Sequence, residues 1–284
     1  MSRRWCVLVL VVVLASPACG GATSGAAKGT PSHTPTPTPS TASSVFDAPV
    51  IEGSFAVGPD RTRLAIRCWG SGSPVIIMEG GSGEGGLGRW ERNPVTEALA
   101  NHTEVCAYDR AGSGESDAAP HRARGLDDVV ADLHALLREV GVSTPYLMTG
   151  VSGGGFDAFH YAGRYPAQVA GLVMIETPAG QNKMSAKDVK ELAWDSPGNS
   201  EHVKYVEVEH QMAVARLPIG PIPVTVVTGR TGQSAGDLPS QRVWLKGSSL
   251  PRQVILETGH EVDVDDPAGL TREMLATLEA AQRR

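Results

Sequence analysis

The sequence predicts an α/β fold with a doubly wound, mostly parallel sheet. Short apolar runs alternate with segments whose apolar residues recur every three or four positions, which is typical of strands and helices in such sheets. The clearest helical pattern starts at Leu126 and ends at Gly141. The runs predicted to be strands are 63–68, 75–78, 105–108, 146–149, 169–175, 224–228 and 254–257.

The N-terminus predicts export. Two arginines precede an apolar run over residues 6–15, which is too short for a membrane span and typical of a signal peptide, so we expect residues 1–18 to be removed. The sequence Ser16-Pro17-Ala18-Cys19-Gly20 resembles a bacterial lipobox, with serine where leucine is usual. The resemblance implies that Cys19 carries lipid and anchors a lipoprotein at the outer face of the cell membrane. Ordinary secretion is the alternative.

Residues 19–44 are predicted to form a tether, because Gly, Ser, Thr and Pro dominate them and almost nothing there could enter a core. Proline-rich segments extend by about 3 Å per residue. Residues 45–284 suffice for one α/β domain with a large core. The 25 basic and 31 acidic residues give a net charge of −6, which argues against a nucleic-acid partner.

A Gly-Val-Ser-Gly-Gly sequence at residues 150–154 lies between the predicted strand 146–149 and a helix-like segment at 156–165. A serine between glycines at a strand-to-helix turn is typical of a nucleophile elbow, in which the glycines relieve crowding and the serine projects above the sheet. The pattern recurs around Ser234 without those flanks, and a plain Gly/Ser-rich loop is the alternative in a chain with 33 glycines. Ser152 is therefore the predicted nucleophile.

His260 is the predicted base. It follows the strand 254–257, and residues at the carboxyl ends of strands in an open α/β sheet face the ligand crevice. The other seven histidines fall in the tether or in helix-like or loop stretches.

From about residue 45 to its end, the chain resembles an α/β-hydrolase-fold serine hydrolase. Residues 74–83 are similar to the family's strand and oxyanion loop, and residues 108–116 to its Y-D-R-x-G-x-G-x-S turn. Residues 259–267 are similar to its histidine loop, and serine precedes histidine as in the family. The family commonly has His-Gly after the first of these strands, where this chain has Glu79-Gly80.

The resemblance implies an acyl transfer in which His260 takes the Ser152 proton and an acid orients His260. Backbone N–H groups of Gly81 and Gly153 would form the oxyanion hole. It further implies an ester as the small-molecule acyl substrate, with no cofactor and no metal. A peptidase, a carbon–carbon hydrolase and a non-catalytic envelope binding protein are the alternatives.

The position of the acid is open between two residues. Many relatives place it soon after the strand that corresponds to 224–228, yet no carboxylate follows here before Asp237. Some family members carry it after the strand that corresponds to 169–175, where Glu176 stands, and we favour Glu176. Three further carboxylates follow His260 closely and are interpreted as loop and capping groups: Asp263, Asp265 and Asp266.

The segment 179–218 interrupts the strand–helix alternation where the family inserts its lid. Five of its residues could line a pocket or simply pack: Met184, Trp194, Tyr205, Val206 and Met212.

The cysteines predict one disulfide. Cys6 leaves with the signal peptide and Cys19 would carry lipid, so Cys68 and Cys106 remain. The family's strand order makes their strands neighbours, and export exposes them to oxidising conditions. We therefore expect a Cys68–Cys106 disulfide, with two buried thiols as the alternative.

Overall fold

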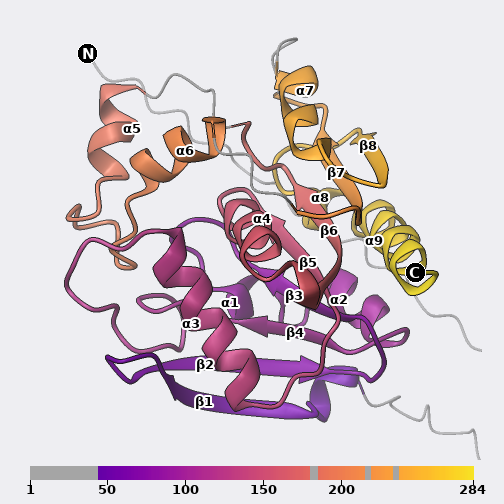
Figure 1. The fold of residues 1–284 in the computed structure, drawn as a ribbon, viewed down its shortest axis with the longest axis horizontal. Helices are drawn as coiled ribbons and strands as arrows, with labels where there is room; N and C mark the ends of the chain where they lie inside the picture. Colours follow the sequence, from indigo (N-terminus) through magenta and orange to yellow (C-terminus); the bar gives the residue numbers. More distant parts are fainter. Residues whose placement is uncertain (1–43, 180–184, 215–218, 233–236) are drawn as a thin grey trace, which may run out of the picture. The chain divides into compact units, whose positions relative to one another are not determined.

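The computed structural model describes residues 44–179, 185–214, 219–232 and 237–284 (Figure 1). These residues form an eight-stranded sheet with the strand order β1-β2-β4-β3-β5-β6-β7-β8. All neighbouring pairs are parallel except β1·β2 and β2·β4. The fold class predicted from the sequence is confirmed. The strands are β1 (Ile51–Val57), β2 (Thr62–Trp69), β3 (Val75–Glu79), β4 (Val105–Tyr108), β5 (Tyr146–Val151), β6 (Val169–Ile175), β7 (Pro223–Gly229) and β8 (Leu250–Leu256).

Strand β1 is absent from the sequence-based prediction, and its position explains why. It is an edge strand paired only with β2, and most of its residues are half-buried. Its sequence, IEGSFAV, therefore has neither the continuous apolar run of a central parallel strand nor a strict alternation. Strand β8 begins four residues earlier than predicted, at Leu250, because its first residues are exposed.

Helices cover both faces of the sheet (Figure 1). Helices α3 and α4 pack in one apolar core with Ile77 and Met148, and α1, α2 and α9 pack in the other with Ile76 and Leu147. Successive residues of β3 and β5 thus face opposite cores, as the alternation of side chains along a strand requires. The helices are α1 (Gly86–Trp90), α2 (Pro94–Ala100), α3 (Leu126–Glu139), α4 (Gly154–Arg164), α5 (Ala186–Glu191), α6 (Tyr205–Val214), α7 (Asp237–Ser240), α8 (Val262–Asp265) and α9 (Pro267–Gln282).

Helix α3 shows how local sequence sets an element's ends. Asp128 accepts a hydrogen bond from the backbone N–H of Gly125 at 2.8 Å, which caps the first turn. The last turn ends at Glu139, and Gly141 then adopts a φ of 76°, the left-handed conformation that glycine reaches without steric cost. The predicted helix is confirmed.

The segment expected to form a lid, residues 179–218, which we call the lid segment, contains α5 and α6 between β6 and β7. Tyr205 and Met212 are buried in the core that contains α3 and α4, so both residues pack in this core. Trp194 and Val206 are half-buried, and Met184 lies outside the described residues.

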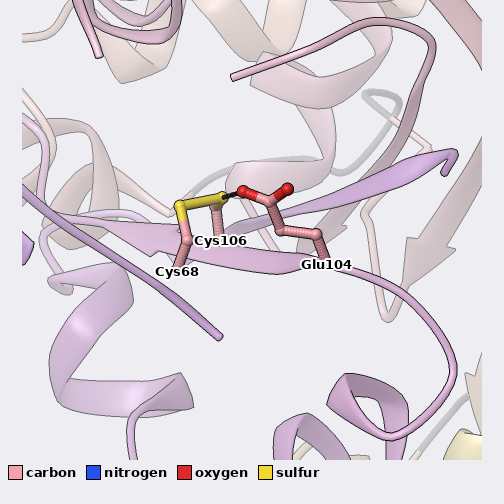
Figure 2. A group of neighbouring side chains, drawn as sticks. All are labelled: Cys68, Glu104 and Cys106. Carbon is pink, nitrogen blue, oxygen red and sulfur yellow. Dashed lines mark hydrogen bonds between the residues drawn. A yellow bond between two sulfur atoms is a disulfide. The ribbon is translucent and has the colours of Figure 1, made fainter. Parts of the chain in front are cut away.

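Strands β2 and β4 place Cys68 directly opposite Cys106, and the two sulfurs form a disulfide (Figure 2). The carboxylate of Glu104 lies 3.8 Å from the Cys106 sulfur. Because both sulfurs are in the disulfide, this group offers no thiolate to a metal ion.

The predicted signal peptide, Cys19 and nearly all of the tether lie outside the described residues. Among the helices that the structure describes, none has both the length and the apolar character needed to cross a membrane.

Candidate active site

Ser152 lies in a strained turn between β5 and α4. Its φ is 51°, and its backbone N–H donates to the carbonyl of Ile175 at 2.8 Å. A left-handed backbone at a residue other than glycine costs about 1–3 kcal/mol and persists only where neighbouring structure enforces it. Here the next strand, β6, holds the turn, so Ser152 stands at the carboxyl end of the sheet in the geometry of a nucleophile elbow.

The glycines around Ser152 are required by close packing. A Cβ atom at Gly150 would overlap the carbonyl of Gly154, and one at Gly154 would overlap the carbonyl of Gly80. A Cβ atom at Gly153 would overlap the hydroxyl of Ser82. The turn therefore packs against the loop after β3, residues 80–85, which we call the oxyanion loop.

Glu176 and His260 are brought into contact although they are 84 positions apart. Glu176 directly follows β6, is buried and has a φ of 47°. One carboxylate oxygen accepts the backbone N–H of Gly229 at 2.7 Å, and the other lies 3.3 Å from Nδ1 of His260. The hydrogen bond from Nδ1–H of His260 to the Glu176 carboxylate raises the pKa of His260, while burial opposes the shift. Because Nδ1 is held by Glu176, Nε2 is the nitrogen able to take a proton from a nucleophile.

Asp237, the other candidate acid, is the first residue of α7, and its side chain lies outside the described residues. This short helix is absent from the sequence-based prediction. Ser234 also lies outside the described residues.

The carboxylates after His260 have structural roles, as interpreted from the sequence. Asp265 accepts the N–H of Gly259 at 2.8 Å, and Asp266 caps α9. Asp263 forms an ion pair with Arg89.

The two predicted oxyanion donors lie beside Ser152. A Cβ atom built on Gly81 would be 3.8 Å from Cβ of Ser152, and Gly153 is the next residue, at the start of α4. In this structure the N–H of Gly81 donates to the carboxylate of Glu84 at 3.1 Å. The same carboxylate of Glu84 forms an ion pair with Arg89, with 3.1 Å between Oε2 of Glu84 and Nη1 of Arg89. An oxyanion formed at Ser152 would compete with Glu84 for this donor.

A buried cluster of charged side chains contacts the oxyanion loop. None of these side chains is part of the site predicted from the sequence. Arg110 contacts one carboxylate oxygen each of Glu79 and Asp157 at 3.4 Å, and both oxygens of Glu201 at 3.0 and 3.1 Å. All four side chains are at most 8% exposed. One feature of the sequence indicates this cluster, namely Glu79, which stands where the family commonly has histidine. A carboxylate that ends a buried strand needs a partner.

Glu79 and Asp157 both contact Nη1 of Arg110 in a buried site, so ionising both of these carboxylates is costly. Burial raises the pKa of Glu79 to about 8, with the charge of Asp157 adding to the shift and Arg110 opposing it. Burial likewise raises the pKa of Asp157 to about 7. We infer that Glu79 and Asp157 together hold a proton near neutral pH.

An apolar cavity of about 690 Å³ lies between α2 and α9. Pro94 and Ala98 line it from one helix and Leu275 from the other, and none of the candidate site residues borders it. It is therefore distinct from the site at Ser152.

Comparison with known proteins agrees with the fold. A family model described as alpha/beta hydrolase fold matches residues 73–211. The protein named "Putative carbamate hydrolase RutD" of Pantoea ananatis is 33% identical over 101 residues, which are 36% of this chain and 35% of that protein. The chain spans 35–43% of the length of the curated relatives that it matches.

Solved structures match over most of the described chain. A thermophilic esterase from Thermogutta terrifontis has a TM-score of 0.63 at 18% identity, covering 81% of this chain and 99% of that one. An esterase from Exiguobacterium antarcticum has a TM-score of 0.64 at 16% identity, covering 81% and 100%. The chain has the alpha/beta hydrolase fold.

Proposed function

We propose that this protein is a serine hydrolase that transfers the acyl group of an ester to water. The observation that carries the proposal is the contact of Glu176 with Nδ1 of His260, at the sheet edge where Ser152 occupies its strained turn. A serine at such a turn, together with a histidine held by a buried carboxylate, is the set of groups that activates a hydroxyl nucleophile.

In the proposed reaction, Nε2 of His260 takes the hydroxyl proton as the Ser152 oxygen attacks the carbonyl carbon. Glu176 stabilises the imidazolium that forms. The proton then passes to the leaving alcohol as the carbon–oxygen bond breaks, which leaves an acyl-serine. Water attacks the acyl-serine by the same proton route and restores Ser152.

Gly81 and Gly153 are the proposed donors to the developing oxyanion. One such donor is typically worth about 3–4 kcal/mol of transition-state stabilisation. Because the N–H of Gly81 donates to Glu84 in the structure, the proposal requires that carboxylate to yield to the oxyanion. Its side chain is 41% exposed, so it has room to turn toward solvent.

The proposed place of action is the cell envelope, and it is supported by the signal-like N-terminus and the lipobox-like sequence around Cys19. A carbamate is a second candidate substrate, because relatives bear the name of carbamate hydrolases and the carbamate carbonyl is open to the same attack.

The first prediction tests the nucleophile. Ser152→Ala should lower the hydrolysis of p-nitrophenyl esters by roughly a thousandfold or more and abolish labelling by a fluorophosphonate, because only an activated serine reacts readily. Ser234→Ala is the control, since it alters the second Gly-x-Ser-x-Gly sequence. Esters with acyl chains of two to sixteen carbons, an aryl carbamate and aminoacyl anilides would define the substrate class. Loss of activity in Ser234→Ala with activity kept in Ser152→Ala would contradict the assignment, and an unlabelled wild type would favour a binding protein.

A further inference from the structure

One buried arginine holds several carbonyl groups of the oxyanion loop. The guanidinium of Arg110 donates to the carbonyl of Gly80 at 2.9 Å, to that of Gly81 and to that of Glu84 at 3.2 Å. A planar guanidinium presents its donors in a rigid fork, so these bonds fix the orientation of the peptide groups that they engage.

The orientation of one peptide group decides where a proposed oxyanion donor points. The peptide bond between Gly80 and Gly81 is planar, and in a trans peptide the C=O and N–H groups point in opposite directions. Because Arg110 binds the Gly80 carbonyl, the N–H of Gly81 points away from Arg110. A rotation of this peptide would remove the donor from the site at Ser152.

The base of the lid segment holds Arg110 in turn. Glu201 accepts from Nε of Arg110 at 3.1 Å and from Nη2 at 3.0 Å, a two-point contact between buried groups. The hydroxyl of Tyr205 donates to Glu201 and accepts the backbone N–H of Gly83 at 3.3 Å. Lid residues therefore contact the oxyanion loop both directly and through Arg110.

The same part of the lid segment is attached to the rest of the fold by its backbone. Arg124 pairs with Val203 in a parallel β-bridge, in which Arg124 donates to the carbonyl of His202 and accepts from Lys204, each at 2.9 Å. The carbonyl of Ser200 packs so closely on Gly112 that a Cβ atom there would overlap it. Glu201 and Tyr205 thus hold the oxyanion loop from a fixed backbone.

We propose that Arg110 and Tyr205 are positioning residues for the oxyanion hole, through which the base of the lid sets the direction of the Gly81 N–H. The inference rests on the proposed function, since it assigns a role to residues around the same site. An oxyanion exists in the transition state and not in the bound ester, so loss of this support lowers kcat and leaves KM nearly unchanged.

The test removes one hydroxyl group. In Tyr205→Phe, kcat for p-nitrophenyl butyrate falls by about ten- to hundredfold, because a small displacement of a catalytic group can cost that much, and KM stays within about twofold. Inhibition by 2,2,2-trifluoroacetophenone, whose serine adduct carries an oxyanion, weakens by the same factor as kcat/KM. Arg110→Lys keeps the charge without the fork and gives the same pattern. Tyr146→Phe is the matched control, because this buried hydroxyl donates to the carbonyl of Val142 at 3.0 Å near the opposite end of the sheet.

The outcomes separate the two proposals. If Tyr205→Phe folds as the wild type does, as judged by circular dichroism and its Tm, and keeps kcat and inhibitor affinity within about twofold, the positioning role is overturned and the serine mechanism stands. A change in KM alone, or an equal loss in Tyr146→Phe, overturns it too. A wild type that neither cleaves the ester nor reacts with a fluorophosphonate overturns the proposed function and this inference with it. Should Arg110→Lys fail to fold, Tyr205→Phe decides.

Discussion

At the scale of single residues, His260 carries the pH dependence of the proposed reaction. The hydrogen bond that His260 donates to Glu176 raises its pKa above the ordinary value of about 6.5. The neutral imidazole is the base, so kcat/KM should fall as the pH drops through that raised pKa. The acidic limb of the pH profile is therefore expected above 6.5.

Substitution of the acid tests this assignment. Glu176→Gln removes the largest cause of the shift, so the acidic limb should move to lower pH, and kcat should fall by roughly a thousandfold because the imidazolium loses its partner. Asp237→Asn is the control and should keep both the limb and the rate. A wild-type limb at or below 6.5 would contradict the raised pKa of His260, and a loss of activity in Asp237→Asn alone would move the acid to the loop after β7.

The proposed triad and the cluster at Arg110 differ in how far the sequence predicts them. Ser152, Glu176 and His260 each follow a recognisable strand, and strand ends meet at one edge of a parallel sheet. Arg110 and Glu201 are 91 positions apart, and Glu201 lies in a segment without strand or helix periodicity. No local pattern states which buried carboxylate a given arginine meets.

At the scale of elements, the junction of β5 and α4 depends on the absence of a side chain. A Cβ atom at Gly150 would overlap backbone atoms of Gly154 and Gly155, which cannot rotate away as a side chain can. Gly150→Ala should therefore lower the free energy of unfolding by about 1–3 kcal/mol or more, and lower ester turnover as the elbow shifts. Thermal unfolding and p-nitrophenyl ester kinetics measure both effects.

A second glycine supplies the control. Gly88 lies within α1, where an added Cβ atom would meet nothing within 4 Å. Gly88→Ala should be neutral or stabilise the protein by up to about 1 kcal/mol, because alanine has the higher helix propensity. Equal Tm values for the two variants would show that the elbow accommodates a side chain, contrary to the packing seen here.

At the scale of the whole molecule, residue patterns alone predict strands and helices but not the order of strands in the sheet. The central strands appear as apolar runs because both of their faces are buried. Strand β2 pairs with β4, and Trp69 lies opposite Val105, which is 36 positions further along the chain. No local pattern records such a long-range pairing. The resemblance to a known fold supplied that neighbour relation, and with it the expectation that Cys68 and Cys106 meet.

The disulfide between these strands should contribute to the stability of the whole domain. It links residues 38 positions apart, and the chain-entropy model assigns a loop of that length about 4 kcal/mol. In a domain of this size, such a loss corresponds to a decrease in Tm of about ten degrees. We expect this decrease in Cys68→Ala/Cys106→Ala and in wild type refolded after reduction, measured by circular dichroism. A reductant should leave the double variant unchanged. Mass spectrometry of the unreduced protein provides the direct test, because two cysteines that alkylate after denaturation without reductant would exclude the bridge.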